Sequence, residues 1–396
     1  MNPLSSIRTF WIQRVHPFFV VTRFVFTIAN ALTSTIGTIY LLGKGLSFTE
    51  VGLVWSVTLF FSTVLDFPTG NFADLYGRKL AYVLGVISIG IGNFIFGVGG
   101  NITVFFVAAF FVGFGAAQIS GSLSSWVVDE QIKADKKDEI RKIFGDGSSA
   151  ASVGGIVGGL LVGLFFDGPL EIIYFASAFT FIGLGVFVFL NIPDNYGKPG
   201  GRWISLPREV ITHFVHSLPL IVASAALVLT FACYTVFLFL WQPLALEYGI
   251  VEGDLGYLYS IFMAGSAAGA FIMGRIGRRI HEIMILLICF AVTATGFVTI
   301  SLNLGVLGLV AGLLQFALGY GGFIPVLYAW VNQFIPSSIR ASATSLIATI
   351  GTGGIIVLQV LMGALVQSWG LIAASLCAVV FALLGAFLLL LLYKKS

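Results

Sequence analysis

Twelve long apolar runs, separated by short polar connections, constrain the fold of this chain more than any other feature of its sequence. A helix needs about 20 apolar residues to cross the hydrocarbon core of a bilayer. The runs cover residues 18–42, 49–69, 80–98, 102–127, 146–166, 171–190, 219–243, 254–274, 282–301, 304–331, 341–366 and 370–393. Only 9% of the 396 residues are charged, against about 25% in soluble domains. The sequence therefore predicts an all-α integral membrane protein.

The composition argues against several other classes of protein. No soluble basic domain is available to bind nucleic acid. All three cysteines fall inside apolar runs, which leaves no disulfide framework and no CxxC metal site. The four histidines lie in or beside the connections and not near a cysteine, and no P-loop is present. We expect no catalytic site, no metal and no cofactor.

The basic residues predict the orientation of the spans. Of the 20 Lys and Arg residues, all but Lys44 and Arg23 fall on one side of the twelve-span arrangement. Lys and Arg in short loops stay on the cytoplasmic side. We therefore expect a multi-pass protein of the cell membrane with both termini in the cytoplasm.

A polar segment divides the spans into two sets of six. Residues 191–218 contain a Gly- and Pro-rich stretch typical of a linker, and residues 203–216 could form a short amphipathic helix on the membrane surface. Residues 1–190 and 219–396 are thus predicted to be two six-helix halves. They repeat each other: Ile140-Arg141 and Trp126-Val127 correspond to Ile339-Arg340 and Trp330-Val331. Such pseudo-symmetric halves are one scheme by which transporters are built.

Polar side chains follow one face of two spans. In the first span Arg23, Thr27, Asn30 and Ser34 recur at steps of four, three and four. In the fourth span Gln118, Ser122, Ser125 and Asp129 repeat those steps. Residues so spaced share one helix face. They either line a cavity or bridge packed helices; for Asn30 and Gln118, near mid-membrane, we favour the cavity.

The connection between the second and third spans carries the most specific motif. It reads Gly70-Asn-Phe-Ala-Asp74-Leu-Tyr-Gly77-Arg78-Lys79. This spacing resembles the loop between helices two and three of the major facilitator superfamily, except that Leu75 replaces the usual basic residue. The resemblance covers nearly the whole chain and implies that superfamily's fold: twelve helices in two halves that rock about a central site.

The resemblance also assigns expected roles to particular residues. Gly70, Asp74, Gly77, Arg78 and Lys79 would form a charge latch with Asp129 at the end of the fourth span. The first, fourth, seventh and tenth spans would surround the substrate. The cavity candidates are then Arg23, Asn30, Ser34, Gln118, Ser122, Tyr234, Trp241, Gln315 and Tyr320, with Gln359 of the eleventh span as an addition.

Two charged residues inside the first and second spans bear on whether transport is coupled to protons. Asp66 and Arg23 lie at comparable depth, where a charge costs free energy unless it is paired. Asp66 is either half of a structural ion pair with Arg23 or the group that binds a transported proton. No carboxylate lies at mid-membrane, and this argues against proton exchange.

These features predict a secondary transporter, and not an enzyme, that moves a small, moderately apolar or drug-like solute. Glycines of the fifth span (Gly145, Gly154, Gly158, Gly163) resemble an antiporter pattern in part and favour export in exchange for protons. A uniporter or symporter of a metabolite or organic anion is the alternative, and Arg23 would suit an anion. A lipid flippase or a ligand-sensing membrane protein stays open as another class. A small solute, candidate coupling protons and bilayer lipid are the expected partners, and a monomer is the expected state.

Overall fold

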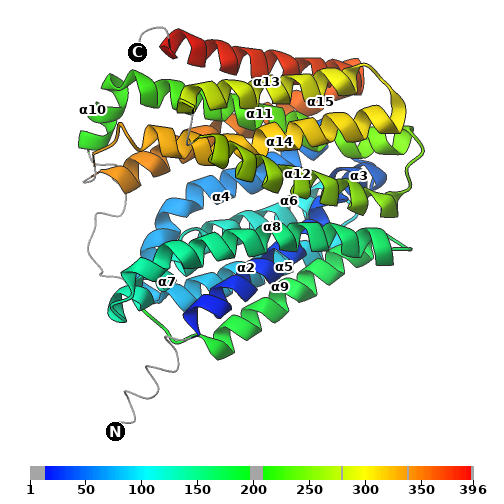
Figure 1. The fold of residues 1–396 in the computed structure, drawn as a ribbon. Coiled ribbons are helices and arrows are strands. Elements are labelled where there is room, and N and C mark those ends of the chain that lie inside the picture. The colour runs from blue at the N-terminus through cyan, green and yellow to red at the C-terminus, as the bar shows by residue number, and fades with distance from the viewer. Residues whose placement is uncertain (1–13, 197–207, 278–279, 337–338, 394–396) are drawn as a thin grey trace. The chain divides into compact units, whose positions relative to one another are not determined.

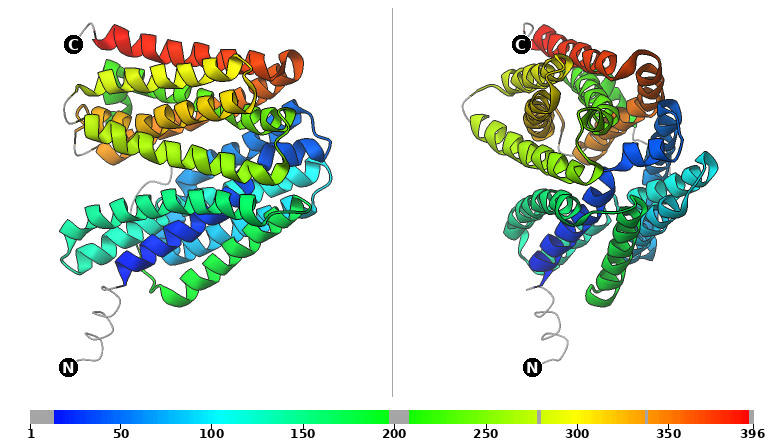
Figure 2. Two further views of the ribbon diagram at one scale, coloured as in Figure 1. Left: turned by 45° about the vertical axis from the view of Figure 1, so that its right-hand side comes forward. Right: turned by 90° about the vertical axis from the view of Figure 1, so that its right-hand side faces the viewer.

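The computed structural model describes residues 14–196, 208–277, 280–336 and 339–393, except the side chains of residues 67–71, 74, 208 and 341. Eleven helices in this described part are long and apolar enough to cross a membrane. The last, α15 (Arg340–Tyr393), has 54 residues and would be about 80 Å long if straight, more than twice the hydrocarbon thickness. Gly370, with a φ of 84°, divides it, and Figure 2 shows the change of direction between its orange and red parts. The predicted all-α fold of twelve membrane helices is confirmed.

The chain packs as two compact units. Unit 1 contains the described residues up to 35 and from 60 to 196, and unit 2 contains residues 36–59 and those from 208 onward. Residues 36–59, which the sequence places among the first six spans, therefore pack with the later half of the chain.

Unit 1 is built from helices of the first six spans (Figure 1). These are α2 (Val15–Ser34), the second part of α4 (Phe48–Tyr76), α5 (Arg78–Val98), α6 (Ile102–Ile119), α7 (Ser122–Lys133), the 3₁₀ turn η1 (Lys137–Glu139), α8 (Ile140–Phe165) and α9 (Glu171–Asn191). Helix α2 packs against α8 and α9, and α5 packs against α6 and α9. Phe19, Trp126 and Phe181 belong to the buried core that they enclose.

Unit 2 contains the remaining helices. They are α3 (Gly37–Gly43), the first part of α4, α10 (Arg208–His216), α11 (Leu218–Glu247), η2 (Glu252–Asp254), α12 (Leu255–Ile276), α13 (Glu282–Ser301), α14 (Gly305–Val331) and α15. Helix α11 packs along α15, and α14 packs against both α12 and α13. The first part of α4 lies against α15, where Ser56 Oγ donates to the Ile356 carbonyl at 2.6 Å.

Two predicted spans are each made of two helices. The first span is interrupted at Thr35–Ile36, between α2 and α3. The fourth is interrupted at Ser120–Gly121, between α6 and α7, where Gly121 has a φ of 74°. A positive φ cannot continue a right-handed helix. The prediction that Gln118 and Asp129 share one continuous helix face is therefore wrong, because the break separates them.

The linker contributes one helix to the described part. Helix α10 (Arg208–His216) occupies the second portion of the amphipathic segment predicted over 203–216. Its His213 Nε2 lies 2.9 Å from the Phe334 carbonyl, which fixes the helix to unit 2. Residues 203–207 lie outside the described part.

Candidate functional site

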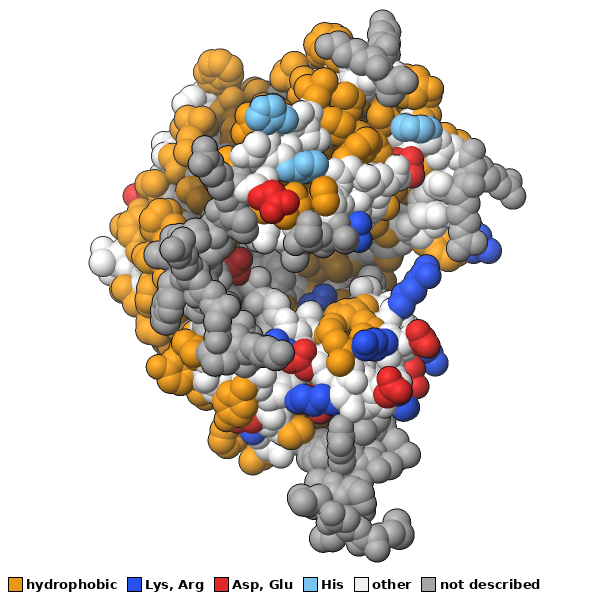
Figure 3. Space-filling view, turned by 90° about the vertical axis from the view of Figure 1, so that its left-hand side faces the viewer, with side chains coloured by type: hydrophobic (Ala, Val, Ile, Leu, Met, Phe, Trp, Pro, Cys, Tyr) orange, Lys and Arg blue, Asp and Glu red, His pale blue; other side chains and the backbone are white. Residues whose placement is uncertain are grey.

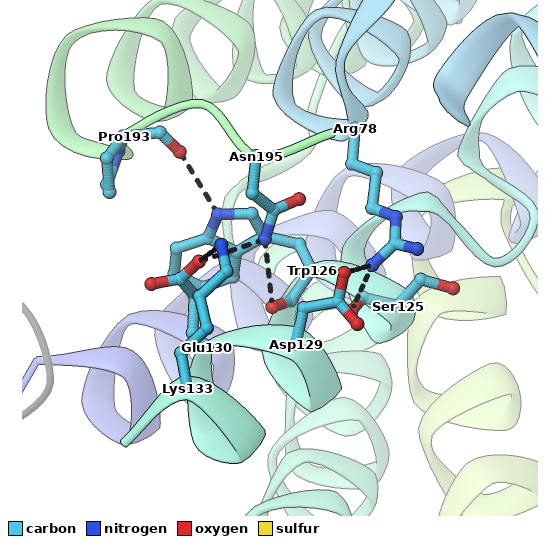
Figure 4. A network of polar contacts seen from close by, with 8 residues as sticks. All are labelled: Arg78, Ser125, Trp126, Asp129, Glu130, Lys133, Pro193 and Asn195. Atoms are coloured by element: carbon cyan, nitrogen blue, oxygen red, sulfur yellow. Dashed lines mark hydrogen bonds and ion pairs between the residues drawn. The ribbon is translucent and has the colours of Figure 1, made fainter. Parts of the chain in front are cut away.

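The candidate site is a charged cluster at one end of unit 1. Arg78, the first residue of α5, directs its Nη1 to Oδ2 of Asp129 on α7 in an ion pair. The same Nη1 donates to the Ser125 carbonyl at 2.7 Å. Only 12% of the Arg78 side chain and 31% of the Asp129 side chain are exposed. A charge-assisted hydrogen bond screened little by solvent is among the stronger polar contacts of a protein. Figure 4 shows both side chains converging between the two helices.

Gly77 sets the position of Arg78. Its φ of 107° belongs to the region that favours glycine. A Cβ on this residue would lie 2.8 Å from Oδ1 of Asp194 and 3.3 Å from Cε1 of Tyr196. The glycine therefore permits both the sharp turn into α5 and the close approach of the segment that follows α9.

That segment, residues 192–196, is part of the cluster. The Arg78 backbone N–H donates to the Asn195 carbonyl at 3.1 Å, and Trp126 Nε1 donates to the Pro193 carbonyl at 3.0 Å. Asn195 is 2% exposed, and its Nδ2 donates to the Trp126 carbonyl at 3.3 Å and to Glu130 Oε1 at 3.1 Å. The chain beyond the sixth span thus ties α5 to α7 (Figure 4).

The sequence predicts a linker over residues 191–218 and so gives no sign of this contribution. The one available signal was Trp126, whose indole N–H needs an acceptor when the ring is buried. It is 3% exposed. Nothing in the local sequence indicated that the acceptor is 67 residues away.

The predicted latch residues are brought together in part. Gly77, Arg78 and Asp129 meet as expected. Lys79 turns away, and its Nζ lies 4.9 Å from the centre of the Phe189 ring. The backbone of Gly70 and Asp74 belongs to α4, but the surroundings of Gly70 and the carboxylate of Asp74 are outside what the structure describes. A latch role for the six residues stays a prediction.

Charged side chains gather around the cluster. Lys133, Lys137, Asp138, Glu139, Arg141 and Lys142 are exposed at the end of α7, in η1 and at the start of α8. Figure 3 shows blue and red side chains concentrated on the face toward which these elements point. We call this the basic end of unit 1. Glu130 and Lys133 form an ion pair there at 2.8 Å.

The cavity candidates of unit 1 differ in exposure. Asn30 is exposed and Ser34 is half-buried, donating its hydroxyl to the Asn30 carbonyl at 2.9 Å. Gln118 is 4% exposed and packs against Gly85 of α5; its Oε1 has no hydrogen-bond partner in the described part. Ser122, 3% exposed, donates to the Gln118 carbonyl. The latter two therefore lie in the packing between helices.

Arg23 and Asp66 are both half-buried. Arg23 interacts electrostatically with the buried Tyr82 of α5. A structural ion pair between Arg23 and Asp66, and proton binding by Asp66, both stay predictions.

The unit 2 candidates centre on aromatic rings. Tyr234 of α11 and Tyr320 of α14 are half-buried and stack with centroids 4.9 Å apart and planes 16° apart. Trp241 is 1% exposed and stacks on Phe237, which makes it part of the core. We call Tyr234, Tyr320, Phe237, Phe262 and Phe316 the aromatic cluster, because each ring contacts others of the group.

Two glutamines complete the unit 2 set. Gln315 Oε1 accepts from the Thr299 hydroxyl at 3.1 Å. Gln359 is 5% exposed, and its Oε1 has no hydrogen-bond partner in the described part. Cavity lining by either one stays a prediction. The described residues also contain no group of three His, Cys, Asp or Glu that could hold a metal ion.

Comparisons with known proteins place these features in context. The model of the Major Facilitator Superfamily matches residues 19–244 and 222–396. The uncharacterized MFS-type transporter YxaM of Bacillus subtilis (strain 168) is 22% identical over 367 residues, which cover 90% of each chain. Multidrug resistance protein 2 of the same organism is 29% identical over 125 residues, or 31% of this chain and 30% of that protein. The crystal structure of the nucleoside transporter NupG matches with a TM-score of 0.82 at 13% identity, over 96% of this chain and 100% of NupG.

Proposed function

This chain is a member of the Major Facilitator Superfamily, and from that premise we propose that it exports small, moderately apolar or drug-like compounds in exchange for protons. It is a multi-pass membrane transporter and not an enzyme. In the proposal the two halves rock to expose a central site to each side in turn. The protein acts as a monomer in the cell membrane, with the basic end of unit 1 in the cytoplasm.

The aromatic cluster carries the proposal. The Tyr234–Tyr320 stack holds two half-buried rings with polar hydroxyl tips face to face. Aromatic surfaces with few polar groups favour ligands that are flat and apolar, because they gain from ring contact and area burial. Similarity to Multidrug resistance protein 2, over 31% of this chain, supports the same class of cargo.

The Arg78–Asp129 ion pair supports the transport cycle. It joins the start of α5 to α7 at the end of unit 1 that carries the basic residues. In the proposal this cluster holds unit 1 rigid through the rocking motion, and the half-exposed Asp66 remains a candidate for proton binding.

Arg23 favours a second candidate function. It is half-buried on the same face of α2 as the exposed Asn30, and a guanidinium suits carboxylate or phosphate recognition. A facilitator or symporter of an organic anion would use that charge directly.

The test is transport by the purified protein in proteoliposomes. With a pH gradient imposed, ethidium, a planar lipophilic cation, should accumulate on the side from which protons leave. A Tyr234→Leu/Tyr320→Leu double variant should lose about tenfold in rate, because the ring faces are gone. Tyr257→Leu, at a surface position that is 36% exposed, is the matched control.

The alternative has a distinct signature in the same vesicles. Counterflow of an organic anion that is lost in Arg23→Gln, together with no response of ethidium to the gradient, would replace the exporter by the anion carrier.

A further inference from the structure

One ion pair of unit 1 belongs neither to the latch nor to the cavity candidates. His16, in the first turn of α2, places its Nε2 2.8 Å from Oδ2 of Asp146 on α8. The side chains are 37% and 47% exposed. The pair joins helices whose first residues are 125 positions apart, at the same end of unit 1 as Arg78.

The His16–Asp146 pair lies beside a tightly packed contact between α2 and α8. A Cβ on Gly154 would lie 2.5 Å from the Phe24 carbonyl oxygen, and one on Gly158 would lie 2.9 Å from the Ile28 carbonyl oxygen. Gly147, next to Asp146, packs directly on the Phe19 ring. Side chains larger than hydrogen would force α2 and α8 apart, so these glycines hold the two partners at a fixed spacing.

His16 also extends the polar face of α2. It precedes Arg23 by seven residues, and seven steps of about 100° return to within about 20° of the starting direction. Arg23, Thr27, Asn30 and Ser34 continue that face. The His16–Asp146 pair therefore forms the exposed end of a polar stripe that runs along the helix.

The charges on neighbouring elements are of both signs. Those on α2 itself, on the rest of α8, on α7 and on η1 are Arg14, Arg23, Arg141, Lys142, Asp129, Glu130, Lys133, Lys137, Asp138 and Glu139. Helix α9 has only Glu171, at its other end. Asp129 and Glu130 are already bound to Arg78 and Lys133, and Glu139 is bound to Lys136. Asp146, whose Oδ2 lies 2.8 Å from His16 Nε2, is therefore the acid that can hold a proton added to His16.

We propose that His16 and Asp146 form the proton-binding site of the transporter. Histidine is the side chain that takes up and releases protons near neutral pH. When neutral His16 donates from Nε2 to Asp146, its Nδ1 accepts the proton and the pair changes from one negative charge to none. This inference rests on the proposed proton antiport and names the group that carries it out.

The exchange follows from charge balance on the stripe. With Arg23 on the same stripe, the unprotonated pair leaves the stripe with no net charge, and the protonated pair leaves it with one positive charge. Proton uptake therefore opposes a lipophilic cation bound at the polar face of α2 and favours its release. Loss of the proton restores the starting state, so one proton is bound and released for each change of affinity.

The experiment measures ethidium transport in proteoliposomes with His16→Gln and Asp146→Asn. Gln keeps a donor to Asp146 but cannot take a proton in this pH range. Both variants should lose at least tenfold in gradient-driven accumulation and lose the pH dependence of the rate. Downhill counterflow should stay within twofold. Lys136→Gln and Glu139→Gln remove an ion pair of similar exposure (3.0 Å, 41% and 50%) at the same end, and should leave both readouts unchanged.

Other outcomes overturn the assignment in distinguishable ways. Gradient-driven transport with the wild-type pH profile in Asp146→Asn means that the proton binds elsewhere, and loss of coupling in Asp66→Asn alone would place it at Asp66. If His16→Gln loses both downhill counterflow and gradient-driven accumulation, the pair has a structural role. If the wild-type protein shows counterflow but its ethidium accumulation does not respond to the pH gradient, the proposed antiport itself is wrong.

Discussion

Trp126 donates its indole N–H to the Pro193 carbonyl at 3.0 Å, so that a side chain of α7 holds the segment that leaves the sixth span. The indole is 3% exposed. Water therefore does not compete for the N–H while the segment is in place, and the bond holds residues 193–196 against Gly77 and Arg78.

Replacing Trp126 by Phe should lower the free energy of unfolding by more than the roughly 0.5–1.5 kcal/mol that one hydrogen bond contributes. The smaller ring also leaves a cavity in the buried core, which adds to the loss. Thermal unfolding in detergent measures it. Trp369→Phe, at a position 75% exposed, should leave the midpoint unchanged, and an equal shift in both variants would contradict the interpretation.

Gly77→Ala should destabilise the cluster by about 1–3 kcal/mol, the cost of holding a residue in a sparsely populated backbone conformation. The added Cβ would also press on Asp194 Oδ1 at 2.8 Å. Gly145→Ala is the matched control, because this glycine of α8 has open space around its Cβ position and no positive φ. It should be neutral or slightly stabilising. Equal behaviour of the two variants in thermal unfolding would refute the role assigned to Gly77.

Arg78→Ala and Asp129→Ala should each slow transport, and the double variant should lose less than the two single losses combined. Removing one partner leaves the other charge half-buried without its counterpart, whereas removing both does not. A double-mutant cycle on initial transport rates measures the coupling. Strict additivity would show that the ion pair contributes nothing to the cycle.

Gln242→Leu should destabilise unit 2 by about 1–3 kcal/mol for each donor left unsatisfied. The Gln242 Oε1 accepts from the backbone N–H groups of Thr38 and Ile39 at 2.9 and 3.1 Å, which are the first donors of α3 without helical partners. Gln242→Glu keeps an acceptor and should be milder than Leu. Thermal unfolding midpoints of the two variants measure the difference. Equal midpoints for Gln242→Leu and Gln242→Glu would contradict a capping role for Gln242.

The spans could be predicted because hydrocarbon thickness sets the length of an apolar run. Helix length is a different quantity: α8 begins at Ile140, six residues before the run predicted from 146, because a helix can continue into water with polar residues. The Arg78–Asp129 pairing followed from the family motif. These successes share a local or family-wide signal.

The features that the sequence did not predict depend on distant parts of the chain or on a single backbone angle. Gly121 is one of 48 glycines, and its sequence neighbours do not distinguish it from those inside helices. Asn195 is polar and flanked by linker-like residues, yet Trp126 and Glu130 bury it. Gln118 has the spacing of a cavity residue, but close approach of α6 to α5 at Gly85 encloses it.

The interruption of the first span at Thr35–Ile36 falls where unit 1 gives way to unit 2. A continuous helix is a stiff rod that would carry torque from one unit into the other. With its hydrogen-bond ladder broken at this point and α3 capped by Gln242, the first span crosses the boundary as two separate rods. Helix α4 (Phe48–Tyr76) crosses the second boundary, between residues 59 and 60, without a break, so it is the stiffer of the two connections.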